Sequence, residues 1–85
     1  MATKKPFFIR AEWDEESRVW VATSEDIPGL ATEAETVEYL IEKLRNMIPE
    51  LLEANGLSLD QDVPFEVLTR RFESTTPHRA KTLNG

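Results

Sequence analysis

One segment of the chain has the apolar periodicity of a helix, and a single stripe of this kind must be covered by other elements. Its apolar residues recur at a spacing of 3.6 and are Val37, Leu40, Ile41, Leu44, Met47, Ile48, Leu51 and Leu52. Thr36 is a good N-cap, and Asn55-Gly56 is a helix stop signal. Pro49 interrupts the run but leaves it in phase, so we expect a kink rather than a break.

Two segments before this helix alternate with period two, as half-buried strands do. In residues 6–13 one face carries Phe7, Ile9, Ala11 and Trp13. A polar break of hairpin length follows at residues 14–17, and residues 18–23 alternate again, so we expect an antiparallel pair. Val19 and Val21 are expected to join the buried face, which places Trp20 on the opposite face.

The rest of the chain completes a small α+β domain. Turn residues at 25–29 precede a short strand over 30–34, and a last strand is expected within residues 63–72. The order β-β-β-α-β predicts two layers, with one helix on one face of a small mixed sheet and the last strand parallel to a neighbour. The expected core is Ile9, Val19, Val21, Leu40, Ile41, Leu44, Ile48 and Leu51. The domain is expected over residues 1–73, with a disordered tail over 74–85.

Length and composition exclude several protein classes. Eighty-five residues suffice for one domain, and the absence of cysteine excludes a disulfide framework and a thiolate metal cluster. No apolar run approaches the ~20 residues of a membrane span, and the first residues lack the apolar core of a signal peptide. We therefore expect a cytoplasmic protein.

The charge is unevenly distributed along the chain. Residues 11–62 carry 14 acidic and 3 basic side chains, a net charge of −11, within a total of −6. Such a segment repels phosphate backbones, so nucleic acid is a poor partner and a basic protein is favoured. The alternative is that these charges only solvate a helix face and two turns.

The stretch from Phe8 to Gly56 resembles the N-terminal domain of the HicB antitoxin family, and most closely a small stand-alone branch described as a domain of unknown function. The resemblance rests on WVATSEDIPGLATEAETVEYLIEKLRNMIPELLEANG, with Asp26-Ile27-Pro28-Gly29-Leu30 as its most specific part, followed by Thr32 and Thr36. It implies a reduced RNase H-like fold and a bacterial toxin–antitoxin system in which HicB neutralises HicA, a small basic toxin that cleaves mRNA.

The chain departs from typical HicB proteins at two points. Those proteins carry a C-terminal DNA-binding segment, whereas 13 residues follow Phe72 here, too few for such a unit. Ala34 stands where many HicB sequences have glycine. We therefore expect no direct contact with nucleic acid, and a HicB-like domain that has lost toxin neutralisation and acts as a homo-oligomer is the alternative.

An RNase H-like fold raises the question of a two-metal nuclease, which needs carboxylates converging on both ions. The candidates are Glu12, Asp14, Glu38 and Glu42, but we expect Glu12 and Asp14 to point to opposite faces, and the last strand offers only Glu66. His78, the single histidine, has no nucleophile or second ligand near it in sequence. We expect no enzyme activity, no cofactor and no metal.

Trp20 and Phe8 are expected on the sheet face away from the helix, where aromatic side chains indicate an interface. The alternative is that the N-terminal arm or the tail covers them. The residues predicted to bind a partner are Phe8, Arg10, Glu12, Arg18, Trp20, Glu25 and Asp26.

Overall fold

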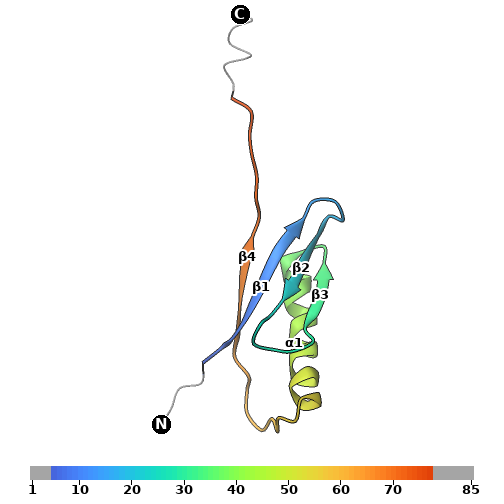
Figure 1. Cartoon of the computed structure of the whole chain (residues 1–85), viewed down its shortest axis with the longest axis vertical. Helices are drawn as coiled ribbons and strands as arrows, with labels where there is room; N and C mark the ends of the chain where they lie inside the picture. Colours follow the sequence, from blue (N-terminus) through green and yellow to red (C-terminus); the bar gives the residue numbers. More distant parts are fainter. Residues whose placement is uncertain (1–4, 78–85) are drawn as a thin grey trace, which may run out of the picture.

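The computed structural model describes residues 5–77. The segment with the apolar stripe forms helix α1 (Val37–Ala54), which packs on a four-stranded sheet (Figure 1). The strands are β1 (Phe7–Asp14), β2 (Val19–Thr23), β3 (Ala31–Ala34) and β4 (Phe65–Arg70). Their order in the sheet is β3-β2-β1-β4, with β4 parallel to β1 and the other pairs antiparallel. The predicted α+β architecture, its order of elements and its parallel last strand are confirmed.

Helix α1 begins and ends where its capping residues predict. The Thr36 Oγ1 accepts a hydrogen bond of 3.1 Å from the Tyr39 amide, which satisfies one of the free donors of the first turn. At the other end Gly56 has a φ of 94°, and the Leu57 amide donates to the Leu52 carbonyl. The helix continues through Pro49, so the proline does not break it.

The turn between β1 and β2 is held by one carboxylate. Asp14 Oδ1 accepts from the Glu16 amide at 3.0 Å and from the Ser17 amide at 3.3 Å. The Arg18 amide donates to the Asp14 carbonyl at 2.7 Å, and Arg18 takes a φ of 60° to bring the chain back. The loop therefore has four residues, and Asp14 lies opposite Val19.

This register corrects the predicted faces of β2. Trp20 pairs with Trp13, and Ala22 pairs with the fully buried Ala11, so Trp20 and Ala22 lie on the helix side of the sheet. The rings of Trp13 and Trp20 meet edge to face with centroids 5.4 Å apart. The prediction that Val19 and Val21 join the core and that Trp20 faces away was wrong, because the odd-numbered side chains of β2 point to the uncovered face.

The core lies between α1 and the sheet. Its buried residues are Ile9, Ala11, Ala22, Ile27, Leu30, Ala34, Leu40, Leu44, Ile48 and Leu52. Of the predicted core, Ile9, Leu40, Leu44 and Ile48 are confirmed, whereas Ile41 and Leu51 are half-buried. Gly29 has a φ of 86° in the turn before β3, and this turn delivers Ile27 and Leu30 to the core.

The chain continues past β4 as an exposed segment that runs beyond the body of the domain (Figure 1). We call residues 71–77 the C-terminal arm. Residues 74–77 are exposed and belong to no helix or strand. The rest of the predicted disordered tail, residues 78–85, lies outside the described residues.

Leu44→Ala should lower the free energy of unfolding by about 2–5 kcal/mol, because it deletes a fully buried side chain at the centre of the α1 stripe. Urea unfolding followed by far-UV circular dichroism measures this. Leu57→Ala is the matched control, since Leu57 is 50% exposed and its truncation should cost less than about 1 kcal/mol. Equal costs for the two variants would contradict the helix phase.

Trp20→Ala should also destabilise the fold, by about 2 kcal/mol, because the indole packs on Trp13 and against the core. Val21→Ala, at the next position but on the opposite face, is expected to cost less. Urea unfolding measures the free energy of unfolding of both variants. A Trp20→Ala variant as stable as the parent would contradict the register of the hairpin.

Candidate interaction surfaces

One face of the sheet is not covered by α1 or by any other described element. Figure 1 shows α1 on one side of the sheet, over β2 and β3. The register of the strands defines the other side, which we call the open face. Its side chains are those of Phe8, Arg10, Glu12, Asp14, Val19, Val21, Thr23, Ala31, Glu33, Glu66, Leu68 and Arg70.

The open face combines apolar surface with an excess of acidic groups. Phe8, Val19 and Val21 are half-buried there, and Leu68 is 56% exposed. Four carboxylates stand on this face against two guanidinium groups. An apolar centre with a charged surround is typical of a protein-binding surface.

Val21 lies between two of these carboxylates. It is directly opposite Glu12 on β1 and directly opposite Glu33 on β3, and side chains so placed are neighbours. A lysine or arginine side chain from a partner could lay its methylene groups on Val21 and direct its charge to the acids. This row therefore offers an aliphatic contact flanked by two hydrogen-bond acceptors.

Four of the seven predicted partner-binding residues lie near one another on or beside the open face. Phe8, Arg10 and Glu25, with Thr23 and Ser24, line a hollow of about 120 Å³ at one end of the face. The Arg10 guanidinium lies 5.8 Å from the centre of the Phe8 ring. Glu12 is further along the same strand and face.

The other three predicted residues have different surroundings. Asp26 Oδ2 accepts from the Phe8 amide at 2.8 Å, so this carboxylate ties the β2–β3 turn to the start of β1. Arg18 lies in the hairpin turn, where it forms an exposed ion pair of 3.0 Å with Glu15. Trp20 lies on the helix side and does not share a surface with Phe8.

Sequence reasoning missed the residues that replace Trp20 on the open face. They are the two valines of β2, together with Glu33 and Leu68 from the edge strands. Alternation alone could not find them, because both faces of residues 19–22 carry apolar side chains. The number of residues in the loop after Asp14 was the signal that decides the face.

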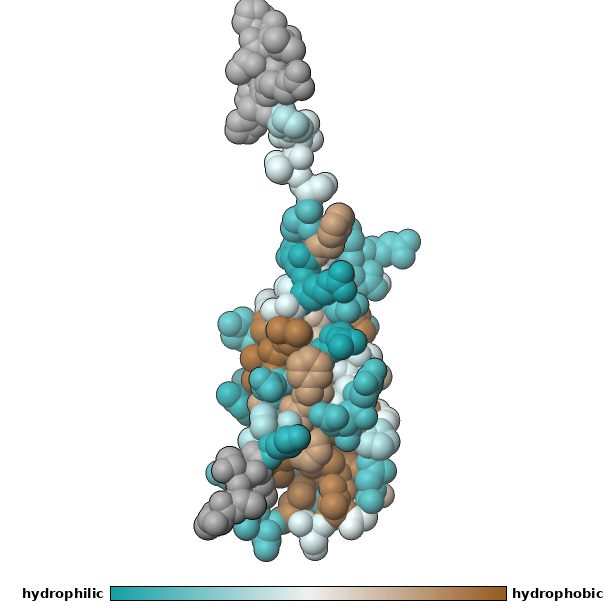
Figure 2. Space-filling view, turned by 60° about the vertical axis from the view of Figure 1, so that its left-hand side comes forward, coloured by the Kyte–Doolittle hydropathy of each residue, from teal (hydrophilic) through white to brown (hydrophobic). Residues whose placement is uncertain are grey.

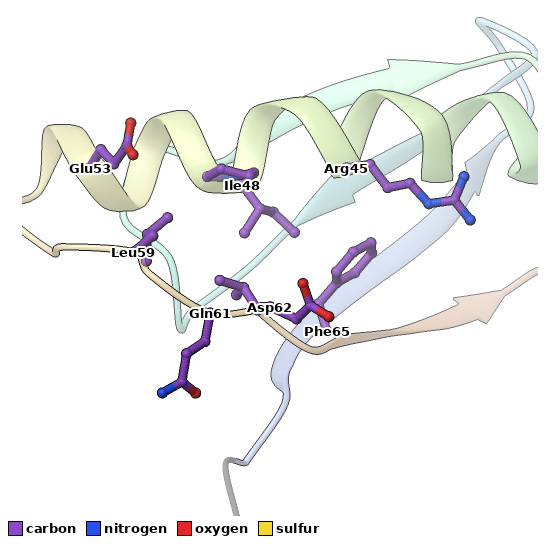
Figure 3. Close-up of a pocket in the computed structure, with 9 residues that line it drawn as sticks. Arg45, Ile48, Glu53, Leu59, Gln61, Asp62 and Phe65 are labelled. Atoms are coloured by element: carbon purple, nitrogen blue, oxygen red, sulfur yellow. The ribbon is translucent and has the colours of Figure 1, made fainter.

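A groove separates α1 from the segment that leads into β4. It has a volume of about 520 Å³, and Figure 3 shows Ile48 and Phe65 pointing toward each other across it, while Gln61 points away. Arg45 and Asp62 contribute charged groups to its walls. The groove exists because α1 lies mainly over β2 and β3, so β4 is only partly covered.

A second, more apolar hollow of about 280 Å³ lies nearby. It is lined by Lys5, Phe7, Leu52, Leu57, Ser58, Leu59, Val63 and Pro64. In the space-filling view, which brings the side with β4 forward, hydrophobic surface alternates with hydrophilic surface (Figure 2). The β4 side of the molecule is therefore less completely covered than the β2–β3 side.

The acidic residues considered for two-metal chemistry do not gather. Glu12 and Asp14 both lie on the open face, so the prediction that they point to opposite faces was wrong, because residues two apart in a strand share a face. Glu38 and Glu42 belong to α1 on the other side of the sheet. Asp14 accepts two amides of the hairpin turn. Across residues 5–77, no three histidine, aspartate or glutamate side chains are placed to hold a metal ion. Within the same residues, no helix is long and apolar enough to cross a membrane.

Comparison with known proteins gives a family and a similar solved structure. The crystal structure of a hypothetical protein, TTHA1013, from the extremely thermophilic bacterium Thermus thermophilus is 46% identical and superposes with a TM-score of 0.65. The match covers 85% of this chain and 99% of that one. Among curated proteins, none is similar enough to count as a match. The model of one family, described as a domain of unknown function (DUF1902), matches residues 6–77, which include the C-terminal arm. The chain belongs to this DUF1902 family.

Proposed function

We propose that this protein is a small non-catalytic binding domain, a HicB-like antitoxin that binds and neutralises a basic HicA-type toxin that cleaves mRNA. The observation that carries the proposal is the open face, where apolar side chains and four carboxylates are presented with no described element over them. The toxin binds there through basic and aliphatic side chains. No cofactor, metal or membrane takes part.

The charge of the chain supports a basic partner. The net charge of −11 over residues 11–62 attracts a cationic protein over a distance and repels nucleic acid. Glu12 and Glu33, on either side of Val21, then supply the short-range contacts. Long-range attraction and local contacts thus favour the same class of partner.

The resemblance to HicB supports the same proposal. The order β-β-β-α-β agrees with the reduced RNase H-like fold that the resemblance implies. The motif Asp26 to Leu30 has a structural role here, since Asp26 holds the start of β1 and Ile27 and Leu30 enter the core. The motif therefore belongs to the scaffold that presents the open face, and the partner contacts come from neighbouring residues.

A second candidate is a homo-oligomeric HicB-like domain that no longer neutralises a toxin. The exposed edge of β4 and the arm that follows it favour this candidate, because they offer a surface for a second copy. The two candidates use different surfaces, so experiments can separate them.

Reversing two charges on the open face should weaken toxin binding. We expect Glu12→Lys combined with Glu33→Lys to reduce affinity by at least about tenfold, because both carboxylates beside Val21 become repulsive to a basic partner. The test is co-expression with the open reading frames that neighbour this one, followed by pull-down and, for any small basic protein retained, calorimetry.

The matched control is Glu42→Lys combined with Glu50→Lys, which changes the net charge equally on exposed positions of α1. This control should retain binding. Equal losses in both double variants would leave only the net charge as an explanation and would contradict the open face as the site. Failure of the unaltered chain to retain any neighbouring basic protein would contradict the antitoxin proposal.

The rate of association with the toxin should fall as salt rises. The Debye length shortens from ~10 Å at 0.1 M to ~3 Å at 1 M, which screens the attraction between the acidic domain and a cationic partner. Stopped-flow mixing at several salt concentrations measures the rate. A rate independent of salt would show that the charge does not steer the partner.

A further inference from the structure

β4 is an edge strand, and its hydrogen-bonding groups alternate between β1 and the outside. The Phe7 amide donates to the Pro64 carbonyl at 3.0 Å while Phe7 lies opposite Phe65. In a parallel pair this means that the even-numbered residues of β4 direct their amides and carbonyls to β1. The odd-numbered residues Phe65, Val67 and Thr69 direct theirs outward, to an edge that no described residue covers.

The C-terminal arm continues this strand without a strand partner of its own. Within residues 5–77, no backbone group of residues 72–77 is hydrogen-bonded to another backbone group. Phe72 is 86% exposed, and Leu68 in β4 is 56% exposed. An extended segment with free backbone groups and an exposed aromatic side chain has the properties of a strand that pairs with another chain.

The start of the arm is held in line with β4. The Arg71 guanidinium lies 4.3 Å from the centre of the Trp13 ring, and its Nε donates to Glu73 Oε2 at 2.6 Å. These contacts anchor the first residues beside the β1–β2 hairpin and direct the rest past it (Figure 1). The arm is therefore presented in the strand direction, away from its own domain.

We propose that the partner of this edge is a second copy of the chain. Two copies pair residues 65–77 antiparallel about a two-fold axis near Arg71, so that the arm of each lies on the outer edge of the other's β4. The lengths agree, since β4 has six residues and residues 72–77 are six. With this centre, Val67 pairs with the partner's Thr75, and Thr69 pairs with the partner's Glu73. All four have odd numbers, which is the parity that faces outward.

Apolar burial and charge favour the same pairing. The even-numbered side chains of both strands meet on the open-face side, where Leu68 lies diagonal to the partner's Phe72. The two most exposed apolar side chains of this region then shield each other from water. Residues 5–70 carry 15 acidic and 6 basic groups, net −9, whereas residues 71–85 carry net +2. The net charge of the C-terminal segment is therefore opposite in sign to that of the rest of the chain, which favours association between copies.

Proline substitutions at two neighbouring positions test the pairing. Proline removes an amide donor and is tolerated only where that amide does not bond within the sheet. In the proposed pairing the Thr75 amide faces the partner, whereas the Ser74 amide faces away from the partner. We expect Thr75→Pro to weaken dimerisation by at least about tenfold, while Ser74→Pro dimerises like the parent. Phe72→Ser should weaken it as well.

The measurement is sedimentation equilibrium of the full chain over a wide concentration range, and the parent should approach twice the 9.7 kDa of one chain. Far-UV circular dichroism checks that each variant remains folded, which is expected because these side chains make no contact with the core. A parent that stays monomeric at every concentration overturns the proposal. A dimer that Ser74→Pro and Thr75→Pro weaken equally also overturns it. So does a dimer that none of the three variants weakens, Phe72→Ser included.

This inference is separate from toxin binding. The Thr75→Pro variant, if monomeric, should still retain the basic protein in the pull-down, because the open face of one copy is unchanged. If the parent fails to bind a toxin, only the proposed function is contradicted. If the parent fails to self-associate, only the proposed dimer is contradicted.

Discussion

The hydrogen bonds of Asp14 determine the arrangement on which the rest of the molecule depends. By accepting the Glu16 and Ser17 amides, this carboxylate fixes a loop of four residues between β1 and β2. A loop one residue shorter or longer would turn every side chain of β2 to the other face. With four residues, Ala22 meets Ala11 under α1, and these small side chains let the leucines of the helix approach the sheet closely. The valines of β2 are left on the open face.

A single helix on four strands leaves two features without a partner. Because α1 lies mainly over β2 and β3, one whole face of the sheet and the outer edge of β4 have no described element against them. Natural sheets protect such edges by charge, by short length or by pairing. β3 shows the first two devices, since it has four residues and Lys43 Nζ donates to the Glu33 carbonyl at 2.6 Å. β4 has six residues, and no described side chain is hydrogen-bonded to its outer carbonyls as Lys43 is to Glu33; it leads instead into an extended arm. This contrast assigns pairing to the β4 edge.

The sequence predicts the elements well and the faces less well, for a physical reason. The helix, its Thr36 cap and the parallel last strand follow from periodicity and capping chemistry, which are local. The face of β2 depends on loop length, and the apolar residues 19–22 fit either face, so composition could not correct the error. Of the candidate site, Phe8, Arg10 and Glu12 could be placed from the alternation of β1 alone. Trp20 could not, and the contribution of Leu68 required the pairing of β1 with β4, which is distant in sequence.

The open face and the β4 edge are compatible with each other. A two-fold axis that relates antiparallel neighbours in one sheet stands perpendicular to that sheet, so both copies keep their open faces on the same side and both helices on the other. The paired sheet would then present one continuous surface, in which the acidic rows around Val21 occur twice. Leu68 and Phe72 would lie at its centre, where apolar side chains contribute most to binding. Self-association through the edge therefore enlarges the surface proposed for the toxin, and it leaves Glu12 and Glu33 accessible on each copy.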